Sequence, residues 1–241
     1  MITVVVLAFN EEKFLSKTID IMMEAAAAAG QVALDIIIVN DGSKDATPQI
    51  IRQLEAQHSF VRSIHHVKNI GPGAGVKEAI AMARYPQFIV TPGDNDLPKE
   101  LVTQLFLNKD KADLVLAYYL NMNERGWFRS GLSRLYTFFY QWTFNVPIHY
   151  INSPCLYPTD KLRRLNVRSD LFGYSAEMTI KLLCSGCTFY QIAGYRQKEL
   201  SPSRSISWNN LREVAATFLD LVSEVKISGR KHFKYKPVEI F

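Results

Sequence analysis

The residues with the clearest chemical potential are Asp94 and Asp96, which a single residue, Asn95, separates. They follow an apolar run, 88–91, that a Pro-Gly pair ends, and this pattern predicts a buried strand. Two carboxylates held where a strand ends can face one divalent cation, and Mg²⁺ is usually bound by one or two carboxylates together with substrate phosphates. The triplet therefore indicates an enzyme that handles a nucleotide diphosphate, although an Asp/Asn-rich turn also forms after strands for conformational reasons alone.

Two further polar clusters follow apolar runs in the first half of the chain. The segment 10–12 (Asn-Glu-Glu) follows the run 2–8, and the segment 40–43 (Asn-Asp-Gly-Ser) follows the run 35–39. In an open parallel sheet, ligands bind at the edge formed by the carboxyl ends of the strands. Each cluster alone is typical of a turn or a helix cap, but three carboxylate-bearing strand ends at one edge favour a ligand site.

Strand and helix signals alternate along the first half, and this order predicts an α/β fold with a mainly parallel sheet covered on both faces. The second helix has Thr47 as its predicted N-cap and Pro48 at its first position. The predicted strands span 2–8, 35–39, 61–65, 88–91 and 113–119, and the predicted helices span 12–29, 47–57, 73–84, 98–108, 127–145, 173–183 and 209–227.

The bulk composition limits the classes of protein that fit. The 241 residues are 48% hydrophobic and 21% charged, which suits one large globular domain and excludes a disordered chain. The net charge of +5 favours an anionic partner, and without a nucleic-acid-binding signature a nucleotide or a phospholipid fits better than nucleic acid. Three cysteines, no secretory leader pattern and no apolar run of about 18 residues predict a cytoplasmic protein without a spanning helix.

The segment 127–145 combines arginines with many aromatic residues. As a helix it has a wide aromatic surface and a basic leading end, with Arg129 and Arg134 near its start. Such a helix can lie in a membrane interface, with its rings at the headgroups and its arginines near lipid phosphates. A core helix with a solvated arginine face is the alternative interpretation.

Four blocks in the first half, in this order and spacing, resemble family 2 glycosyltransferases of the GT-A fold. They are AFNEE (8–12), VNDGSKDAT (39–47), NIGPGAG (69–75) and DND (94–96). Ala8 stands where the family usually has a proline. The resemblance implies a Rossmann-like, nucleotide-binding, mainly parallel sheet with helices on both faces, plus a C-terminal helical extension.

The same resemblance implies a division of the chain. A GT-A catalytic domain would span 1–200, with a nucleotide-sugar half over 1–120 and an acceptor half over 121–200. An amphipathic helix and a basic tail would follow over 201–241.

The second half is similar to the branch of the family that uses polyprenyl- or dolichyl-phosphate acceptors. RSGLSR (129–134) resembles the segment that opens the amphipathic interface helices of that branch, and GYSAE (173–177) resembles its G-[FY]-x-x-E block. RSIS (204–207) stands where the branch has R-x-x-G-x-S-K. Several positions depart from the branch. Tyr118 lies where it carries an arginine, Ile206 replaces a lysine, Asn152 or His149 stands for an aspartate, and Pro154 stands for a glycine.

On the donor side, the resemblance implies Mg²⁺ or Mn²⁺ and a UDP- or GDP-sugar. Asp96 would be a direct metal ligand, Asp94 would contact the metal or the ribose, and the middle residue, Asn95, would tolerate change. Lys77 would face phosphate, although it also has an interpretation as an exposed helix lysine. The predicted residues around the donor are Ala8, Phe9, Glu11, Asp41, Lys77, Asp94 and Asn95.

On the acceptor side, a phosphate nucleophile is ionised near neutral pH and requires no strong base, whereas a hydroxyl acceptor requires one. For a hydroxyl, Glu177 would be the base and Asp170 a weaker candidate; Glu177 can also be a carboxylate favoured by a helix N-terminus. The predicted ligands of an acceptor phosphate are Arg129, Ser133, Arg134, Arg204 and Ser205. The predicted catalytic residues are Asp96, Glu177, Arg129 and Arg204.

The function that these residues predict is inverting transfer of a sugar from a nucleotide-diphosphate sugar to a polyprenyl phosphate. The protein would act peripherally at the cytoplasmic face of a membrane. One alternative keeps the enzyme class and changes the acceptor to a glycan or lipid-linked sugar hydroxyl. A second alternative is a non-catalytic nucleotide-binding module.

Overall fold

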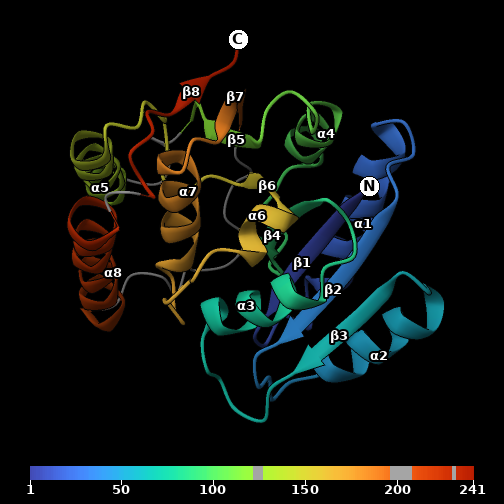
Figure 1. Ribbon diagram of the computed structural model, residues 1–241. Coiled ribbons are helices and arrows are strands. Elements are labelled where there is room, and N and C mark those ends of the chain that lie inside the picture. Colours follow the sequence, from blue (N-terminus) through green and yellow to red (C-terminus); the bar gives the residue numbers. More distant parts are fainter. Residues whose placement is uncertain (122–126, 196–207, 230–231) are drawn as a thin grey trace.

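One mixed sheet runs through the computed structural model, which describes residues 1–121, 127–195, 208–229 and 232–241 (Figure 1). The strands are β1 (Ile2–Ala8), β2 (Leu34–Asn40), β3 (Val61–His65), β4 (Gln87–Pro92), β5 (Leu114–Tyr119), β6 (Cys155–Pro158), β7 (Thr188–Gly194) and β8 (Val238–Glu239). They lie in the order β3-β2-β1-β4-β6-β5-β7-β8. Neighbours pair in parallel except at β6, which is antiparallel to both β4 and β5.

Helices cover both faces of this sheet. They are α1 (Leu15–Ala28), α2 (Thr47–Gln57), α3 (Pro72–Met82), α4 (Lys99–Leu107), α5 (Trp127–Phe144), α6 (Thr159–Arg163), α7 (Tyr174–Cys184) and α8 (Trp208–Leu221), and α8 continues as a π-helical segment, Val222–Ser228. Buried side chains of α1, α2 and α4 form the core on one face, and those of α3 and α5 to α8 form the core on the other. The predicted α/β fold is therefore confirmed.

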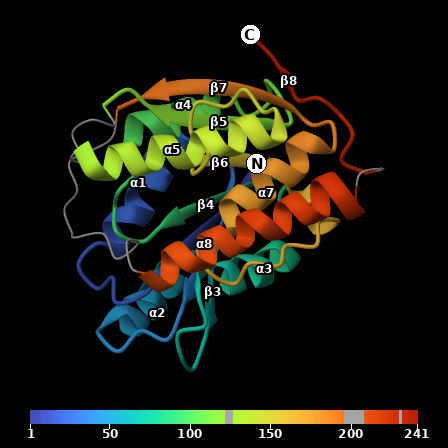
Figure 2. The same ribbon diagram turned by 90° about the vertical axis from the view of Figure 1, so that its left-hand side faces the viewer.

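The layer of α5, α7 and α8 closes the second face. Figure 2 shows α5 and α8 side by side at the front of this layer. They are joined by aromatic packing, because the Phe218 ring lies 5.0 Å from the Tyr140 ring and 5.9 Å from the Phe144 ring, between centroids. Within the described ranges, no helix combines the length and the apolar character needed to cross a membrane.

Each predicted strand is present, and its ends differ from the prediction by one residue at most. The strands β6, β7 and β8 and the short helix α6 were not predicted. β6 has only four residues, and its place is set by pairing, since Leu156 lies opposite Ile89 on one side and Val115 on the other. β8 extends the sheet from the end of the predicted basic tail by pairing with β7. The boundary between 1–200 and 201–241 stays a prediction.

The first helix begins at Leu15, three residues later than predicted, because the preceding backbone is bonded elsewhere. The N–H of Glu11 donates to Thr47 Oγ1 at 2.9 Å, and the N–H of Glu12 donates to Asp45 Oδ2 at 3.2 Å. The same bonds make the predicted N-cap wrong. Thr47 is the first helical residue, and its hydroxyl accepts the N–H of Glu11 in the loop after β1. Asp45 Oδ1 accepts the Thr47 N–H at 3.0 Å.

The core beneath α4 gives a direct test of the packing. Phe106 is fully buried, whereas its neighbour Leu107 is 54% exposed. We expect Phe106→Ala to lower the free energy of unfolding by about 3–5 kcal/mol, because it removes a buried ring and leaves a cavity. Leu107→Ala, the matched control, should change it by no more than about 0.5 kcal/mol. Urea denaturation measures both, and equal effects would contradict this assignment of the core.

Candidate active site

The carboxyl ends of β2, β1 and β4 form one edge of the sheet. Ala8 lies opposite Asn40, and Leu7 lies opposite Pro92. The pairing continues past the strand ends, since the Asp41 N–H donates to the Ala8 carbonyl at 2.9 Å and the Gly93 N–H donates to the Leu7 carbonyl at 2.8 Å. The three polar clusters therefore share one edge, as predicted.

The segment 43–47 holds the loop that follows β1. Its side chains accept hydrogen bonds from the backbone of that loop, beginning with the bond from the Asn10 N–H to Ser43 Oγ at 2.9 Å. The reverse contacts exist too, because Lys44 N–H donates to Asn10 Oδ1 at 2.8 Å and Ala46 N–H donates to Glu12 Oε2 at 2.9 Å. Most polar side chains of this motif thus hold backbone groups in place. Ala8 is buried at the end of β1, and Phe9 and Glu11 after it are partly exposed.

The carboxylate of Asp45 takes part in these contacts between the two loops. Burial by itself would raise the pKa of Asp45, but hydrogen bonds from the Thr47 hydroxyl and from the backbone N–H groups of Thr47 and Glu12 outweigh burial and lower that pKa. The group therefore stays ionised and bonded at neutral pH, and the two loops stay joined.

The turn 94–96 is anchored on α1. Thr18 Oγ1 accepts the Asn95 N–H at 3.0 Å and lies 3.0 Å from the Gly93 carbonyl, to which it donates. Asn95 has a positive φ of 61° and is 3% exposed, and among the described residues neither polar atom of its amide has a hydrogen-bond partner. The tolerance of Asn95 to change stays a prediction, and the backbone argues against it, since few side chains adopt this conformation without strain.

Asp94 and Asp96 are brought together by this turn, with Asp94 Oδ1 accepting the Asp96 N–H at 3.2 Å. Across the described part of the chain, no group of three or more His, Cys, Asp or Glu side chains converges as a metal site. The pair fits a cation that takes its other ligands from a diphosphate and water, which is how Mg²⁺ is usually held beside nucleotides.

Asp41 is buried beneath the loop 66–71. Its Oδ1 accepts the Nδ1–H of His66 at 2.8 Å and the Ile70 N–H at 2.9 Å, and its Oδ2 accepts the Gly71 N–H at 2.9 Å. One acceptor position on Oδ2 is left over, which suits an N–H or O–H of a nucleoside. Sequence reasoning missed His66, although a titratable residue just after a strand on this edge is a usable signal.

Lys77 and Asp170 join α3 to the loop that precedes α7. The Lys77 ammonium forms an ion pair with the Asp170 carboxylate. The Asp170 carbonyl also accepts the Ala74 N–H at 3.1 Å. The structure therefore places Lys77 at the interface between the two halves of the chain, close to the start of α3.

Glu177 lies in the first turn of α7 and is fully engaged with protein groups. Its Oε1 accepts the Arg168 N–H at 2.9 Å and the ammonium of Lys181 at 2.7 Å, and its Oε2 accepts the Ser169 N–H at 2.9 Å. Lys181 is also buried, and it pairs with Glu224 at 2.9 Å. These contacts hold the segment 168–169 against α7 and α8, and a role for Glu177 as a general base stays a prediction.

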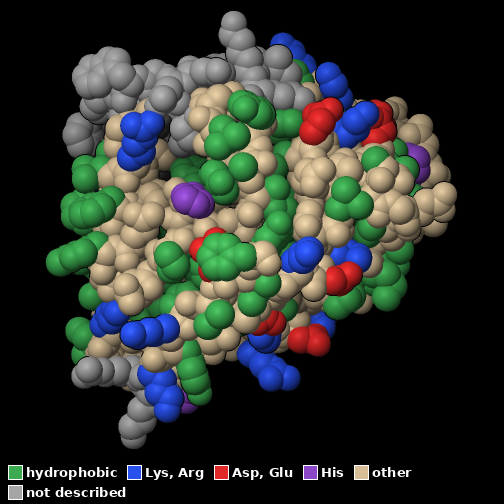
Figure 3. All heavy atoms as spheres, turned by 90° about the horizontal axis from the view of Figure 1, so that it is seen from above, with side chains coloured by type: hydrophobic (Ala, Val, Ile, Leu, Met, Phe, Trp, Pro, Cys, Tyr) green, Lys and Arg blue, Asp and Glu red, His purple; other side chains and the backbone are tan. Residues whose placement is uncertain are grey.

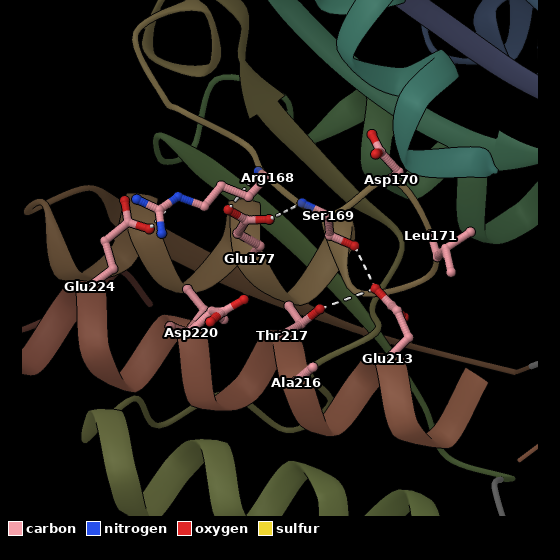
Figure 4. A pocket seen from close by; sticks show the side chains of 11 residues that line it. Arg168, Ser169, Asp170, Leu171, Glu177, Glu213, Ala216, Thr217, Asp220 and Glu224 are labelled. Carbon is pink, nitrogen blue, oxygen red and sulfur yellow. Dashed lines mark hydrogen bonds and ion pairs between the residues drawn. The ribbon is translucent and has the colours of Figure 1, made fainter. Parts of the chain in front are cut away.

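An acidic cavity of about 290 Å³ lies between α8 and the segment 168–171. Figure 4 shows Glu213 reaching from α8 toward Ser169, whose hydroxyl donates to Glu213 Oε1 at 2.7 Å. Arg168 is drawn toward Glu224, 3.5 Å away. The carboxylates that line this cavity disfavour a phosphate ligand, because like charges repel; they are Asp170, Glu177, Glu213, Asp220 and Glu224.

A second cavity, of about 340 Å³, has a different character. It lies where β5 ends, against the middle of α5, and it brings the predicted residues Ser133 and Arg134 together with Tyr118. The Tyr118 ring lies 4.3 Å from the ring of His149, between centroids. The remaining lining residues are neutral or aromatic: Tyr119, Leu120, Thr137, Gln141 and Tyr150.

Some predicted acceptor residues lie outside what the structure describes. Arg204, Ser205 and Ile206 fall in the segment 196–207, and of Arg129 only the backbone in α5 is described. The structure therefore brings Ser133 and Arg134 to one cavity and leaves the roles of the other predicted phosphate ligands as predictions.

Comparison with curated proteins finds partial relatives. Dolichyl-phosphate beta-glucosyltransferase ALG5C of Trichomonas vaginalis is 29% identical over 120 residues, which are 45% of this chain and 36% of that protein. Glycosyltransferase GlyG of Streptococcus pneumoniae is 24% identical over 126 residues, which are 52% of this chain and 40% of that protein. The matches thus span 36–40% of the length of these two relatives.

Solved structures share the fold over nearly the whole chain. Glucosyl-3-phosphoglycerate synthase of Mycobacterium tuberculosis, in complex with Mn²⁺, UDP-glucose and phosphoglyceric acid, superposes with a TM-score of 0.64 at 17% identity, covering 92% of this chain and 80% of that one. A complex of the same synthase with Mg²⁺ and UDP gives a TM-score of 0.65 at 18% identity, covering 91% and 78%.

The sequence profile of glycosyl transferase family 2 matches residues 3–170, which include the three polar clusters of the sheet edge. Because this segment is more than half of the 241 residues, the protein belongs to glycosyl transferase family 2.

Proposed function

We propose that this protein transfers a sugar, with inversion, from a nucleotide-diphosphate sugar to a polyprenyl phosphate at a membrane surface. One observation carries the proposal. The cavity that holds Ser133 and Arg134 opens where β5 ends, and β5 runs parallel to β4, because both are antiparallel to β6. The cavity and the Asp94–Asp96 turn thus lie at the same edge of one sheet, which supports a shared site for donor and acceptor.

Asp94 and Asp96 would hold Mg²⁺ or Mn²⁺ together with the donor diphosphate. When bound, the cation neutralises negative charge that grows on the departing diphosphate. Asp41 offers its remaining acceptor position to the nucleoside, and Phe9 and Glu11, which are partly exposed after the end of β1, would contact the nucleotide. The relative of known structure binds UDP with Mn²⁺ or Mg²⁺, which supports a UDP-sugar donor.

The acceptor phosphate would lie against Arg134 and Ser133. A guanidinium and a hydroxyl suit phosphate oxygens through charge-assisted hydrogen bonds. An ionised phosphate needs no strong base, which agrees with a Glu177 carboxylate that three protein donors already engage. The similarity to a dolichyl-phosphate beta-glucosyltransferase supports the same class of acceptor.

The outer face of α5 supports contact with a membrane surface. Four of its exposed side chains follow the i, i+3, i+4, i+7 spacing of one helix face: Leu135, Phe138, Phe139 and Trp142, which are 46–76% exposed. Hydrophobic side chains project from the left-hand margin of the view in Figure 3, the side on which α5 and α8 lie in Figure 1. An exposed aromatic stripe beside Arg134 suits the headgroup zone of an anionic membrane. A peripheral position at the cytoplasmic face of a membrane belongs to this proposal.

A second candidate keeps the donor and uses a sugar hydroxyl as the acceptor. Tyr118 in place of the arginine of the polyprenyl-phosphate branch favours it, and so does the acidic cavity lined by Asp170 and Glu177. In that reaction a carboxylate would take the hydroxyl proton. Asp170, with a side chain that is 60% exposed, is the more accessible of the two.

The first test concerns Asp96. With labelled UDP-glucose or GDP-mannose, Mn²⁺ and undecaprenyl phosphate, we expect Asp96→Asn to lower the rate of transfer by about 10²-fold or more, since it removes a ligand of the cation. Asp20→Asn, on the exposed side of α1, should leave the rate unchanged, and chelation with EDTA should stop transfer by the unaltered protein. Nucleotide binding without transfer to any acceptor would favour the non-catalytic alternative.

The second test separates the two acceptors. Arg134→Gln should raise KM for the lipid phosphate by at least about tenfold and leave KM for the nucleotide sugar unchanged, because one charge-assisted phosphate contact is worth roughly 1.5–3 kcal/mol. Arg52→Gln, on the exposed side of α2, is the matched control. An unaffected Arg134→Gln variant, together with an inactive Asp170→Asn variant, would support the hydroxyl acceptor instead.

The third test concerns the membrane. Binding to sedimented vesicles of phosphatidylglycerol should fall by about tenfold in Phe138→Ser/Trp142→Ser, because two large side chains no longer enter the interface. Leu107→Ser, which alters a side chain on α4 that is as exposed as Phe138, should bind like the unaltered protein. Equal binding by the α5 and α4 variants would contradict a membrane role for α5.

A further inference from the structure

His66 follows β3 and lies close to the end of β2 and to α3, at the edge of the sheet that carries the polar clusters. Its backbone N–H donates to the Asn40 carbonyl at 2.9 Å, which continues the pairing of β3 with β2. Its imidazole is only 8% exposed, with Nδ1 2.8 Å from Asp41 Oδ1 and Nε2 3.5 Å from Glu78 Oε1 on α3. The side chain thus lies between the end of β2 and α3, bonded to Asp41 through Nδ1, while Nε2 has no hydrogen-bond partner among the described residues.

The chemistry of the pair fixes which nitrogen carries a hydrogen. An ionised carboxylate only accepts hydrogen bonds, so Nδ1 of His66 is the donor to Asp41. The same carboxylate oxygen accepts the Ile70 N–H, and the other oxygen accepts the Gly71 N–H. His66 therefore occupies the one remaining acceptor position of Oδ1 and leaves Oδ2 with a single position for a ligand.

The bonds from Asp41 fix the start of α3. Gly71 is the residue before the helix and has a φ of 102°, a left-handed value that favours glycine. Within α3, a side chain at Gly75 would collide with Val39, so the close approach of α3 to β2 depends on this glycine. The imidazole of His66 therefore lies where α3 packs closely against the end of β2.

We propose that His66 is a positioning residue of the donor site, which holds Asp41 and the backbone of 70–71 in the arrangement that binds the nucleotide. This inference rests on the proposed function, because it takes Asp41 as a residue of the donor pocket. Without the imidazole, the Asp41 carboxylate can rotate, and its ligand-facing oxygen loses its fixed direction. Loss of His66 then weakens nucleotide binding and leaves turnover at saturation largely unchanged.

The experiment compares His66→Ala with His66→Asn, whose side-chain amide can donate from near the position of Nδ1. His58→Asn, in the turn after α2, is the control for removal of an imidazole. In the ligand-free protein, amide hydrogen exchange at Ile70 and Gly71 should be about tenfold faster in His66→Ala. His66→Asn and His58→Asn should exchange like the unaltered protein.

The second measurement is calorimetric titration with UDP and with GDP in the presence of MnCl₂. His66→Ala should raise Kd by about tenfold, with kcat at saturating donor within about twofold, and His66→Asn should restore Kd. If His66→Ala does not fold, His66→Asn is compared with His66→Gln, whose longer side chain carries its amide away from Asp41. Restoration by Asn but not by Gln supports the proposal.

The outcomes separate this inference from the proposed function. Unchanged exchange at 70–71 in His66→Ala, or faster exchange with an unchanged Kd, overturns the positioning role. If the unaltered protein binds neither nucleotide, the proposed donor is overturned, and the exchange measurement alone decides whether His66 holds the loop.

Discussion

The parallel pairing of β1 with both β2 and β4 is the constraint on which the rest of the site depends. It aligns Ala8 with Asn40 and Leu7 with Pro92, so the residues that follow these strands emerge along one edge. Two backbone bonds beyond the strand ends extend that alignment into the loops. The carboxylates of separate motifs meet only because hydrogen-bonded ladders fix where each strand stops.

The polar residues of the motifs divide into two groups by what they contact. Ser43, Asp45 and Thr47 bond to the backbone of 10–12, and Asp41 bonds to the backbone of 70–71. Backbone N–H groups taken out of water require such partners. The motifs therefore serve first to hold irregular loops in place, and the ligand-facing groups are the few that these bonds leave available.

The two halves of the chain meet where the start of α3 touches the segment before α7. A side chain on Gly71 or Gly73 would collide with backbone atoms of 169–171, so close approach of the halves depends on these glycines. The carboxylate of Glu177 accepts hydrogen bonds from the backbone at the start of this segment, and it also pairs with buried Lys181. The carboxylate of Glu177 thus stabilises the fold. The cavity beside α5, by contrast, is lined by an arginine, a histidine and hydroxyl groups.

The sequence by itself determined the α/β order, the five strands of the first half and the edge at which the polar clusters gather, because alternating apolar runs and turn residues act over short distances. The extent of α1, the short strand β6 and the addition of β8 were decided by tertiary structure, since each depends on hydrogen bonds to residues far along the chain. The same holds within the site. Motif spacing pointed to Asp41, Asp94 and Asp96. The contact of His66 with Asp41, the left-handed backbone of Asn95 and the separation of the acidic cavity from the cavity beside α5 appear only in the folded chain, because they depend on contacts between residues that are far apart in the sequence.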